Sequence, residues 1–359
     1  QIVCGGSNVR ENQFVIVALP GSKVVWHGEG EPVEIKASKL RGVESFGMVC
    51  ASTEVGLESI FPLNNDHEIV DLEGLLVSPG EEISKALGLE DIIIEIDNKS
   101  MTNRPDLWGH IGIARELASI YSLPLRLPEP FVKPEGLADI GVKILDAEKC
   151  SRYVAVEFEN VKTEKSPLWL RVLLSSVGIR PINSLVDISN YIMLAVGQPT
   201  HGFDSRLLEG DICIRRADDS ESIELLDGSQ LKLDKNDLVI ADSKGAVALA
   251  GIMGGKRASI ACDTSDMVLE LACFEPIGIR KSASKHNVRT ESSARNEKGI
   301  DKQRIDLALS VASEIIFSFY PEAKITAFHD EDKSSYTQKE ISVSFKWLKT
   351  RLGRDISLD

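Results

Sequence analysis

The sequence has 359 residues, of which 43% are hydrophobic and 27% are charged, and this length predicts two or three domains. No apolar run approaches the roughly 20 residues that span a bilayer, and no basic-then-apolar leader occurs, so we expect a cytoplasmic protein without a membrane partner. The formal net charge of −14 argues against a globally basic nucleic-acid binder but leaves a local basic face open, and the scattered cysteines argue against a zinc ribbon.

Residues 1–78 show the alternation of apolar and polar residues that is typical of β-strands. One run ends at the turn signal Pro20-Gly21, and a second alternates across a glycine turn. Because the chain opens in the middle of this pattern, we expect that the start of the β unit is missing. Three basic side chains crowd into six positions of this region, either as a polyanion-binding face or as an ordinary solvated surface: Lys36, Lys39 and Arg41.

Residues 79–130 predict a smaller unit built around one helix. A β-like run over residues 91–97 comes first, and apolar residues then recur at helical spacing between Ile111 and Tyr121. A proline ends this helix, and the four prolines of residues 123–136 predict a stiff connector. We therefore place a domain boundary at this connector.

Residues 142–322 predict the largest unit, in which helices and strands are mixed. A helix over residues 184–196 ends at a glycine, so residues 198–203 are predicted to form a loop. Strand signals follow, including a hairpin with an Asp-Gly turn, and two further helices close the unit. A charged segment then separates it from residues 338–359, which predict the truncated start of another domain.

Two side chains of this unit stand out as candidates for chemistry, although no nucleophile elbow, P-loop or H-E-x-x-H zinc motif occurs. Glu270 interrupts an apolar strand, where it either faces a pocket or lies on the solvent side. His201 either faces a ligand or is a plain surface residue of its predicted loop. The glycine-rich residues 251–255 indicate either a ligand that approaches the backbone or close packing alone.

Several blocks, in order over nearly the whole chain, resemble the bacterial phenylalanyl-tRNA synthetase beta subunit family. Residues 2–57 resemble its OB-fold tRNA-binding domain, and residues 101–121 resemble the helix that follows. Blocks at 186–204, 238–255 and 289–301 resemble the signature of its editing domain, and residues 341–353 resemble the start of its next domain. The resemblance implies an α+β multidomain fold with four parts: an incomplete OB-fold β-barrel (1–78), a helix-containing connector domain (79–130), an α/β editing domain with antiparallel or mixed sheets (142–322) and a truncated further domain (338–359).

The resemblance also implies a function. The chain would be one subunit of a heterotetramer, with aminoacylation in the alpha subunit, and would bind tRNA(Phe) and hydrolyse misacylated tyrosyl-tRNA(Phe). A phenylalanine pocket rejects an added hydroxyl only about a hundredfold, whereas a site that hydrogen-bonds the hydroxyl discriminates by up to roughly 10⁴–10⁵. No metal or cofactor is expected in this part, since ATP and Mg²⁺ are used by the complete enzyme.

Site residues follow from the same resemblance, residue by residue. His201 is expected to position the terminal ribose or the attacking water, and Glu270 to receive the tyrosine hydroxyl; direct attack by water is favoured over a covalent intermediate. Ser189, Ser292 and Asn296 depart from the family pattern, which leaves open an editing-deficient structural subunit; a free-standing OB protein is the other alternative. The expected groups are catalytic His201, Asn190 and Ser189, substrate-binding Glu270, Ala250, Gly251, Thr290 and Ser292, and tRNA-binding Lys36, Lys39 and Arg41.

Overall fold

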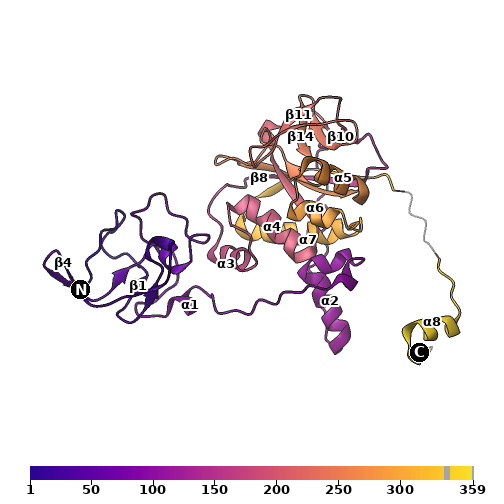
Figure 1. Ribbon diagram of the computed structural model, residues 1–359. Coiled ribbons are helices and arrows are strands. Elements are labelled where there is room, and N and C mark those ends of the chain that lie inside the picture. The colour runs from indigo at the N-terminus through magenta and orange to yellow at the C-terminus, as the bar shows by residue number, and fades with distance from the viewer. Residues whose placement is uncertain (335–339, 358–359) are drawn as a thin grey trace.

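The computed structural model describes residues 1–334 and 340–357. Figure 1 shows an N-terminal β unit, a larger central unit, and a short helix, α8 (Phe345–Leu352), near the C-terminus. Within the described ranges, no helix combines the length and the apolar character that crossing a bilayer requires. The expectation of an α+β protein with antiparallel and mixed sheets is confirmed.

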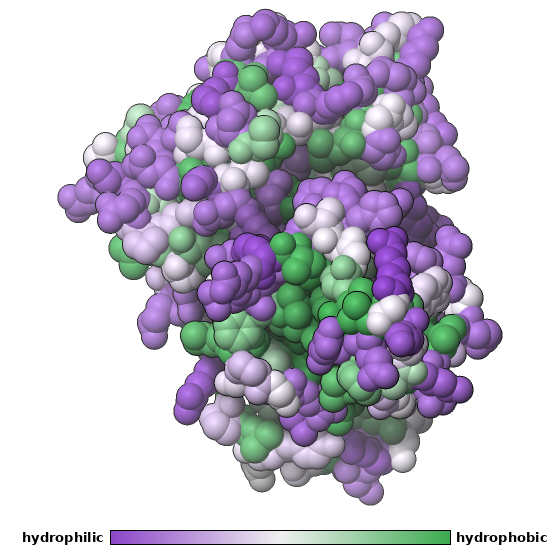
Figure 2. Space-filling model, turned by 90° about the vertical axis from the view of Figure 1, so that its left-hand side faces the viewer, coloured by the Kyte–Doolittle hydropathy of each residue, from purple (hydrophilic) through white to green (hydrophobic). Residues whose placement is uncertain are grey.

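The N-terminal unit is built from short β-ladders around a small core that includes Val24, Cys50 and Phe61. The ladders are separate two-stranded sheets, so residues 1–78 do not close into one continuous barrel sheet, and the OB fold stays a prediction. Figure 2 shows hydrophobic side chains gathered on the lower half of the face that this unit turns to the viewer. The pairs are β1 (Val17–Ala18) with β6 (Met48–Val49), β2 (Lys23–Val24) with β3 (Val33–Glu34), and β4 (Ser38–Leu40) with β5 (Val43–Ser45).

An extended segment connects this unit to the rest of the chain and contains α1 (Ile83–Ala86) and α2 (His110–Tyr121). The helix α2 was predicted, but the β-like run at residues 91–97 forms no strand. No described strand lies alongside this run to supply the backbone hydrogen bonds that a strand needs. Its side chains also remain unburied, since Ile92 and Ile94 are 82% and 77% exposed.

The central unit contains a four-stranded antiparallel sheet in the order β17-β8-β16-β9. Along the two inner strands, successive side chains point to opposite faces. One face carries Ala155 and Ala272, and the other carries Val156 and Leu271. The strands are β8 (Cys150–Glu159), β9 (Thr200–Asp204), β16 (Asp266–Phe274) and β17 (Lys324–Asp332).

A second, five-stranded sheet lies against the first of these faces, in the order β15-β14-β13-β10-β7. It is mixed, because β10 pairs in parallel with β7 and antiparallel with β13. The predicted Asp-Gly hairpin forms as β11 (Ser222–Glu224) and β12 (Gln230–Lys232). The sheet strands are β7 (Val142–Ile144), β10 (Ile212–Arg216), β13 (Leu238–Asp242), β14 (Gly245–Leu249) and β15 (Met253–Gly254).

Helices cover the other face of the four-stranded sheet, so the central unit has three layers: sheet, sheet and helices (Figure 1). The apolar sides of α4 (Ser184–Val196) and α7 (Arg304–Phe319) bury Ile188 and Ile316 against that face. Leu168 of α3 (Leu168–Ser176) packs against the core of the N-terminal unit instead. Two shorter helices, α5 (Pro276–His286) and α6 (Glu291–Asn296), follow β16.

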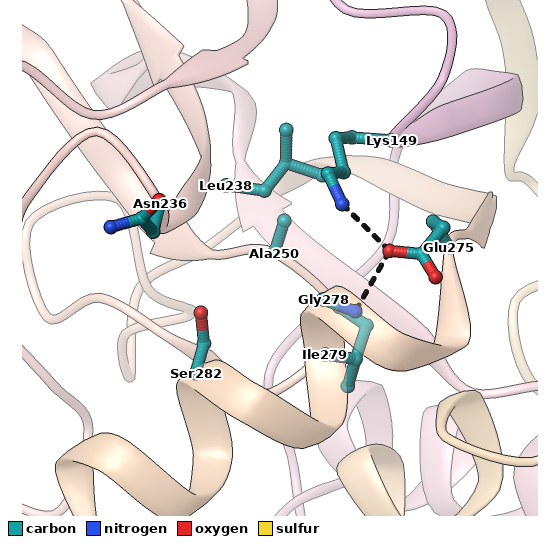
Figure 3. Close-up of a pocket in the computed structure, with 8 residues that line it drawn as sticks. All are labelled: Lys149, Asn236, Leu238, Ala250, Glu275, Gly278, Ile279 and Ser282. Atoms are coloured by element: carbon teal, nitrogen blue, oxygen red, sulfur yellow. Dashed lines mark hydrogen bonds and ion pairs between the residues drawn. The ribbon is translucent and has the colours of Figure 1, made fainter.

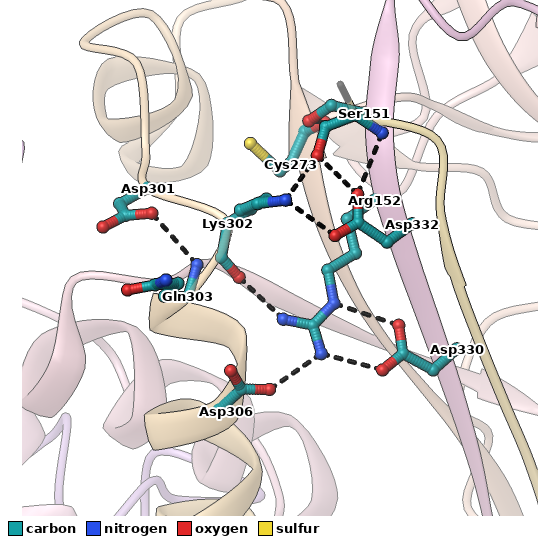
Figure 4. A network of polar contacts seen from close by, with 10 residues as sticks. Ser151, Arg152, Cys273, Asp301, Lys302, Gln303, Asp306, Asp330 and Asp332 are labelled. Carbon is teal, nitrogen blue, oxygen red and sulfur yellow. Dashed lines mark hydrogen bonds and ion pairs between the residues drawn. The ribbon is translucent and has the colours of Figure 1, made fainter. Parts of the chain in front are cut away.

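Arg152 joins the sheet to the helical layer, as Figure 4 shows. Its guanidinium donates two hydrogen bonds to Asp330 on β17, at 3.0 and 2.8 Å, and one to Asp306 on α7, at 2.7 Å. A further one goes to the Lys302 carbonyl. Since the Arg152 side chain is only 11% exposed, this network holds α7 at the edge of the sheet.

Candidate functional site

His201 and Glu270 lie directly opposite each other on neighbouring antiparallel strands, β9 and β16. Residues in this relation project from the same face of the sheet, with Cβ atoms about 4.5–5.5 Å apart. That face is the one between the two sheets, since Val268 and Ala272 alternate with Glu270 and belong to the inter-sheet core. The predicted loop at residues 198–203 is therefore wrong from Thr200 onward, because β9 pairs with β16 along its length.

A pocket opens between the two sheets at this pair and contains about 420 Å³ of empty space, part of it open to solvent. The four-stranded sheet contributes His201 and Glu270, and α6 contributes Ser292 and Asn296. The remaining lining comes from the start of β9, from β16 and from the five-stranded sheet with its glycine turn: Pro199, Thr200, Ile240, Ala248, Leu249, Gly251, Ile252, Met253, Gly254 and Phe274.

Burial keeps both facing side chains uncharged near neutral pH. Glu270 is only 6% exposed, and burial raises the pKa of its carboxyl to about 8. Burial also lowers the pKa of the His201 imidazole to about 4, because the protein interior disfavours the imidazolium. Within the described part of the chain, no hydrogen bond or ion pair reaches the Glu270 carboxyl, so it is free to receive one.

Buried polar atoms without a partner gather around this pocket. Three of them belong to lining residues: Thr200 Oγ1, His201 Nε2 and Asn296 Oδ1. Each such atom costs about 1–3 kcal/mol of lost solvation, so native proteins seldom leave several together. Their concentration indicates a place where a polar ligand supplies the missing hydrogen bonds.

Two glycines shape the pocket wall. A Cβ atom on Gly254 would lie 2.3 Å from His201 Cε1, so only glycine lets β15 pass this close to the imidazole. Gly251 has φ +68°, and its carbonyl accepts hydrogen bonds from Ser292 Oγ and Asn296 Nδ2, both at 3.0 Å. The glycine-rich segment thus serves close packing and forms part of the pocket at the same time.

The structure brings four of the expected site residues to this pocket: His201, Glu270, Gly251 and Ser292. Thr290 lies just outside, where it caps α6 and donates a hydrogen bond to the Ile252 carbonyl at 2.7 Å. It therefore supports the pocket wall without lining it.

Ala250, in contrast, lines a different hollow (Figure 3). There Glu275 accepts hydrogen bonds from Lys149 Nζ at 2.7 Å and from the Gly278 amide at 2.8 Å. Gly251 turns the chain between β14 and β15. Ala250 and Gly251 therefore line different hollows, although they are neighbours in the sequence.

Ser189 and Asn190 do not line the pocket either. Both lie on α4, whose apolar residues pack against the opposite face of the four-stranded sheet. The helix was predicted correctly, but the sheet face that it covers separates these two side chains from Glu270.

The three basic residues of the N-terminal unit are exposed on or beside the β4–β5 hairpin: Lys36, Lys39 and Arg41. Lys39 pairs across the hairpin with Glu44, so the local charge is mixed. Among residues 1–334 and 340–357, no group of three or more His, Cys, Asp or Glu side chains could hold a metal ion.

Sequence reasoning missed several lining residues, among them Thr200 and Phe274, whereas Gly254 lies in the glycine-rich segment that was singled out. Thr200 precedes His201 and Phe274 shares the strand of Glu270, so their proximity to the site follows once the strands are known. Asn296 was noticed only as a departure from a family pattern. Nothing in its sequence position predicts that it reaches Gly251.

Comparison with known proteins shows which family this chain resembles. Residues 149–320 match the model of the B3/4 domain. The phenylalanine–tRNA ligase beta subunit of Solibacter usitatus is 40% identical over 360 residues, which are 99% of this chain and 43% of that protein. The corresponding subunit of Streptococcus pneumoniae is 42% identical over 321 residues, 88% of this chain and 39% of that protein. The chain thus spans less than half the length of these relatives.

One solved structure is also similar, the N-terminal fragment of the phenylalanyl-tRNA synthetase beta subunit from Pyrococcus horikoshii. It is 16% identical, with a TM-score of 0.35, over 75% of this chain and 76% of that chain. This similarity is too low to establish a shared fold, and the family rests on the sequence relatives.

Proposed function

Because the chain belongs to the family of the phenylalanine–tRNA ligase beta subunits, we propose that it binds tRNA(Phe) and hydrolyses tyrosyl-tRNA(Phe) formed in error. The observation that carries this proposal is the pair of Glu270 and His201, side by side in one pocket that contains unpartnered polar atoms. Aminoacylation would reside in an alpha subunit, in a heterotetramer, and would use ATP and Mg²⁺ outside these residues.

Glu270 would read the tyrosine hydroxyl. Its buried carboxyl has no hydrogen bond from the described residues, so a phenol that enters the pocket satisfies it, whereas a phenylalanine ring leaves it unpaired. An unpaired buried group costs about 1–3 kcal/mol, and sites of this kind discriminate by up to roughly 10⁴–10⁵. This is the discrimination that a hydrophobic pocket alone does not provide.

His201 would position the reacting groups at the ester. Its neutral imidazole carries an unpartnered Nε2 that can hydrogen-bond to the terminal ribose or to a water molecule. In the hydrolysis, the water oxygen bonds to the ester carbonyl carbon, the bond from that carbon to the ribose oxygen breaks, and a proton passes to the ribose oxygen. Since no pocket residue is an activated nucleophile, attack by water accounts for the products without a covalent intermediate.

Deacylation of tyrosyl-tRNA(Phe) tests this function in the complete two-subunit enzyme and in this chain. We expect His201→Ala and Glu270→Ala to lower the rate about tenfold or more, because each variant loses a hydrogen bond to the bound substrate that is worth about 1–1.5 kcal/mol. His329→Ala and Glu224→Ala, in the same unit but outside the pocket, serve as matched controls. If wild type and Glu270→Ala deacylate tyrosyl-tRNA(Phe) and phenylalanyl-tRNA(Phe) with the same ratio of rates, Glu270 does not recognise the tyrosine hydroxyl.

An editing-deficient structural subunit is the second candidate. It is favoured by one observation: Ser189 and Asn190, expected beside the reaction, lie across the sheet from the pocket. A wild-type deacylation rate no faster than in buffer, in an enzyme that still aminoacylates tRNA(Phe), would leave only this candidate.

A further inference from the structure

Asn296 holds an unused hydrogen-bond acceptor inside the pocket. The residue is 2% exposed and lines the same space as Glu270 and His201. Its Oδ1 atom is buried and has no partner among the described residues. A buried amide oxygen in this state is costly, which points to a ligand that donates to it.

The orientation of the Asn296 amide is determined by its neighbours. Its Nδ2 atom donates to the Gly251 carbonyl at 3.0 Å and lies 3.3 Å from Ser292 Oγ. A carbonyl oxygen only accepts, so the nitrogen must face Gly251 and Oδ1 must face away from it. The site therefore presents a pure acceptor that cannot turn into a donor without losing the Gly251 contact.

This acceptor lies at a different end of the pocket from Glu270. Asn296 contacts the Gly251 turn beside Phe274, whereas the His201 imidazole, opposite Glu270, packs against Gly254. Phe274 and Glu270 are four residues apart on β16, so their Cα atoms are separated by up to roughly 13 Å along the strand. The two ends can thus contact different groups of one ligand.

The aminoacyl part of a tyrosyl ester has two groups that donate hydrogen bonds, the phenol hydroxyl with one proton and the α-ammonium with three, while the proposed function assigns the ribose to His201. If Glu270 accepts a hydrogen bond from the phenol hydroxyl, the ammonium is the donor left for the acceptor at the Asn296 end of the pocket. We propose that Asn296 Oδ1 accepts a hydrogen bond from the α-ammonium group of the bound aminoacyl ester and selects for that group. This role rests on the proposed function, because the position of the phenol follows from it.

Binding of two small esters to the full chain tests this role: tyrosine methyl ester, and methyl 3-(4-hydroxyphenyl)propanoate, which lacks the amino group. Titration calorimetry at about pH 6 keeps the amino group protonated. In wild type we expect the amino group to strengthen binding at least about tenfold, as a hydrogen bond to a charged group does. The variants are Asn296→Leu, which loses the acceptor, and Asn296→Asp, which keeps an acceptor but loses the amide donor.

The two variants separate recognition from structure. Both lose the contact to Gly251, so a purely structural role would weaken the amino preference equally in both. Recognition instead predicts less than about a twofold preference in Asn296→Leu and a preference retained in Asn296→Asp. An equal preference in wild type and Asn296→Leu, or no wild-type preference, overturns the proposal. An amino preference in a chain that does not deacylate tyrosyl-tRNA(Phe) would instead overturn the hydrolytic function.

Discussion

Glu270 and His201 show how burial sets the chemistry of a side chain. Each has an ordinary pKa that would leave it largely or partly charged between pH 5 and 7, and the interior shifts both toward the neutral form. A protonated Glu270 can donate as well as accept, so it suits a phenol, which does both. The buried pair is thus adapted to an uncharged polar group instead of an ion.

The stability of the protein should depend on pH through Glu270. In the unfolded chain this carboxyl loses its proton near pH 4.5, whereas burial holds its folded pKa at about 8. Between these values the folded state binds more protons, so stability falls as pH rises and the loss is complete above pH 8. Glu270→Gln should remove this loss, up to on the order of 4 kcal/mol at pH 8, and change little near pH 4.

Urea denaturation of wild type and Glu270→Gln at both pH values measures this effect. The low pKa of His201 is common to both proteins, so its titration cancels in the comparison. A stability difference that is the same at pH 4 and pH 8 would contradict the assignment of a buried, protonated carboxyl.

Gly254→Ala should damage the site through sterics alone. The new methyl group would meet the His201 ring at 2.3–2.4 Å, so the imidazole must move. We expect a loss of about 1–3 kcal/mol in stability together with slower tyrosyl-tRNA(Phe) deacylation. Gly5→Ala, with no heavy atom within 4 Å of the new Cβ, is the control and should change neither quantity.

At the level of elements, strand pairing decides which side chains meet. β9 begins after the glycine that ends α4, and its five residues pair with β16. A shift of one residue in this register would turn His201 to the helical layer and away from the pocket. The adjacent network at Arg152 holds α7 against the sheet and so stabilises the layer behind β16.

Arg152→Leu should be destabilising. It would leave Asp330 and the Lys302 carbonyl without their guanidinium partner, and because Asp330 is 33% exposed and can be rehydrated, we expect a loss of about 1–3 kcal/mol. Thermal or urea unfolding measures the loss. Lys143→Ala, which breaks an exposed pair with Asp211, should cost less than about 1 kcal/mol; a similar cost for both would show that the Arg152 network contributes little.

At the level of the whole molecule, two units that are far apart in sequence are in contact. α3, from the central unit, packs Leu168 against the N-terminal core, and Ser175 Oγ lies 2.6 Å from Ser59 Oγ. The exposed basic hairpin and the pocket therefore belong to two units that contact each other directly.

If the β4–β5 hairpin binds the tRNA backbone, replacing Lys36, Lys39 and Arg41 by glutamate should weaken tRNA(Phe) binding. The slope of log K against log salt is negative, and its magnitude should also fall by about 2 to 3, because each phosphate contact contributes roughly 0.7–0.9. Filter binding or fluorescence titration at several salt concentrations measures both. An unchanged slope would indicate an ordinary solvated surface.

Much of the local structure follows from local patterns. The Asp-Gly hairpin, the helices α2, α4 and α5, and the apolar strand interrupted by Glu270 form where periodicity and turn residues predicted them. Local sequence suffices there because hydrophobic period and turn chemistry act within a few residues. The prediction of a strand at residues 91–97 was wrong because strand formation also depends on a distant segment: an apolar run becomes a strand only beside a partner strand.

The sequence by itself determined most of the helices and strands of the central unit, the family and the chemical types of the site residues. Only the tertiary structure decided that His201 lies on a strand, that Ala250, Ser189 and Asn190 lie outside the pocket, and that Asn296 lies within it. The physical reason is that the register of β9 against β16, and the sheet face that each helix covers, depend on pairing between segments more than 60 residues apart.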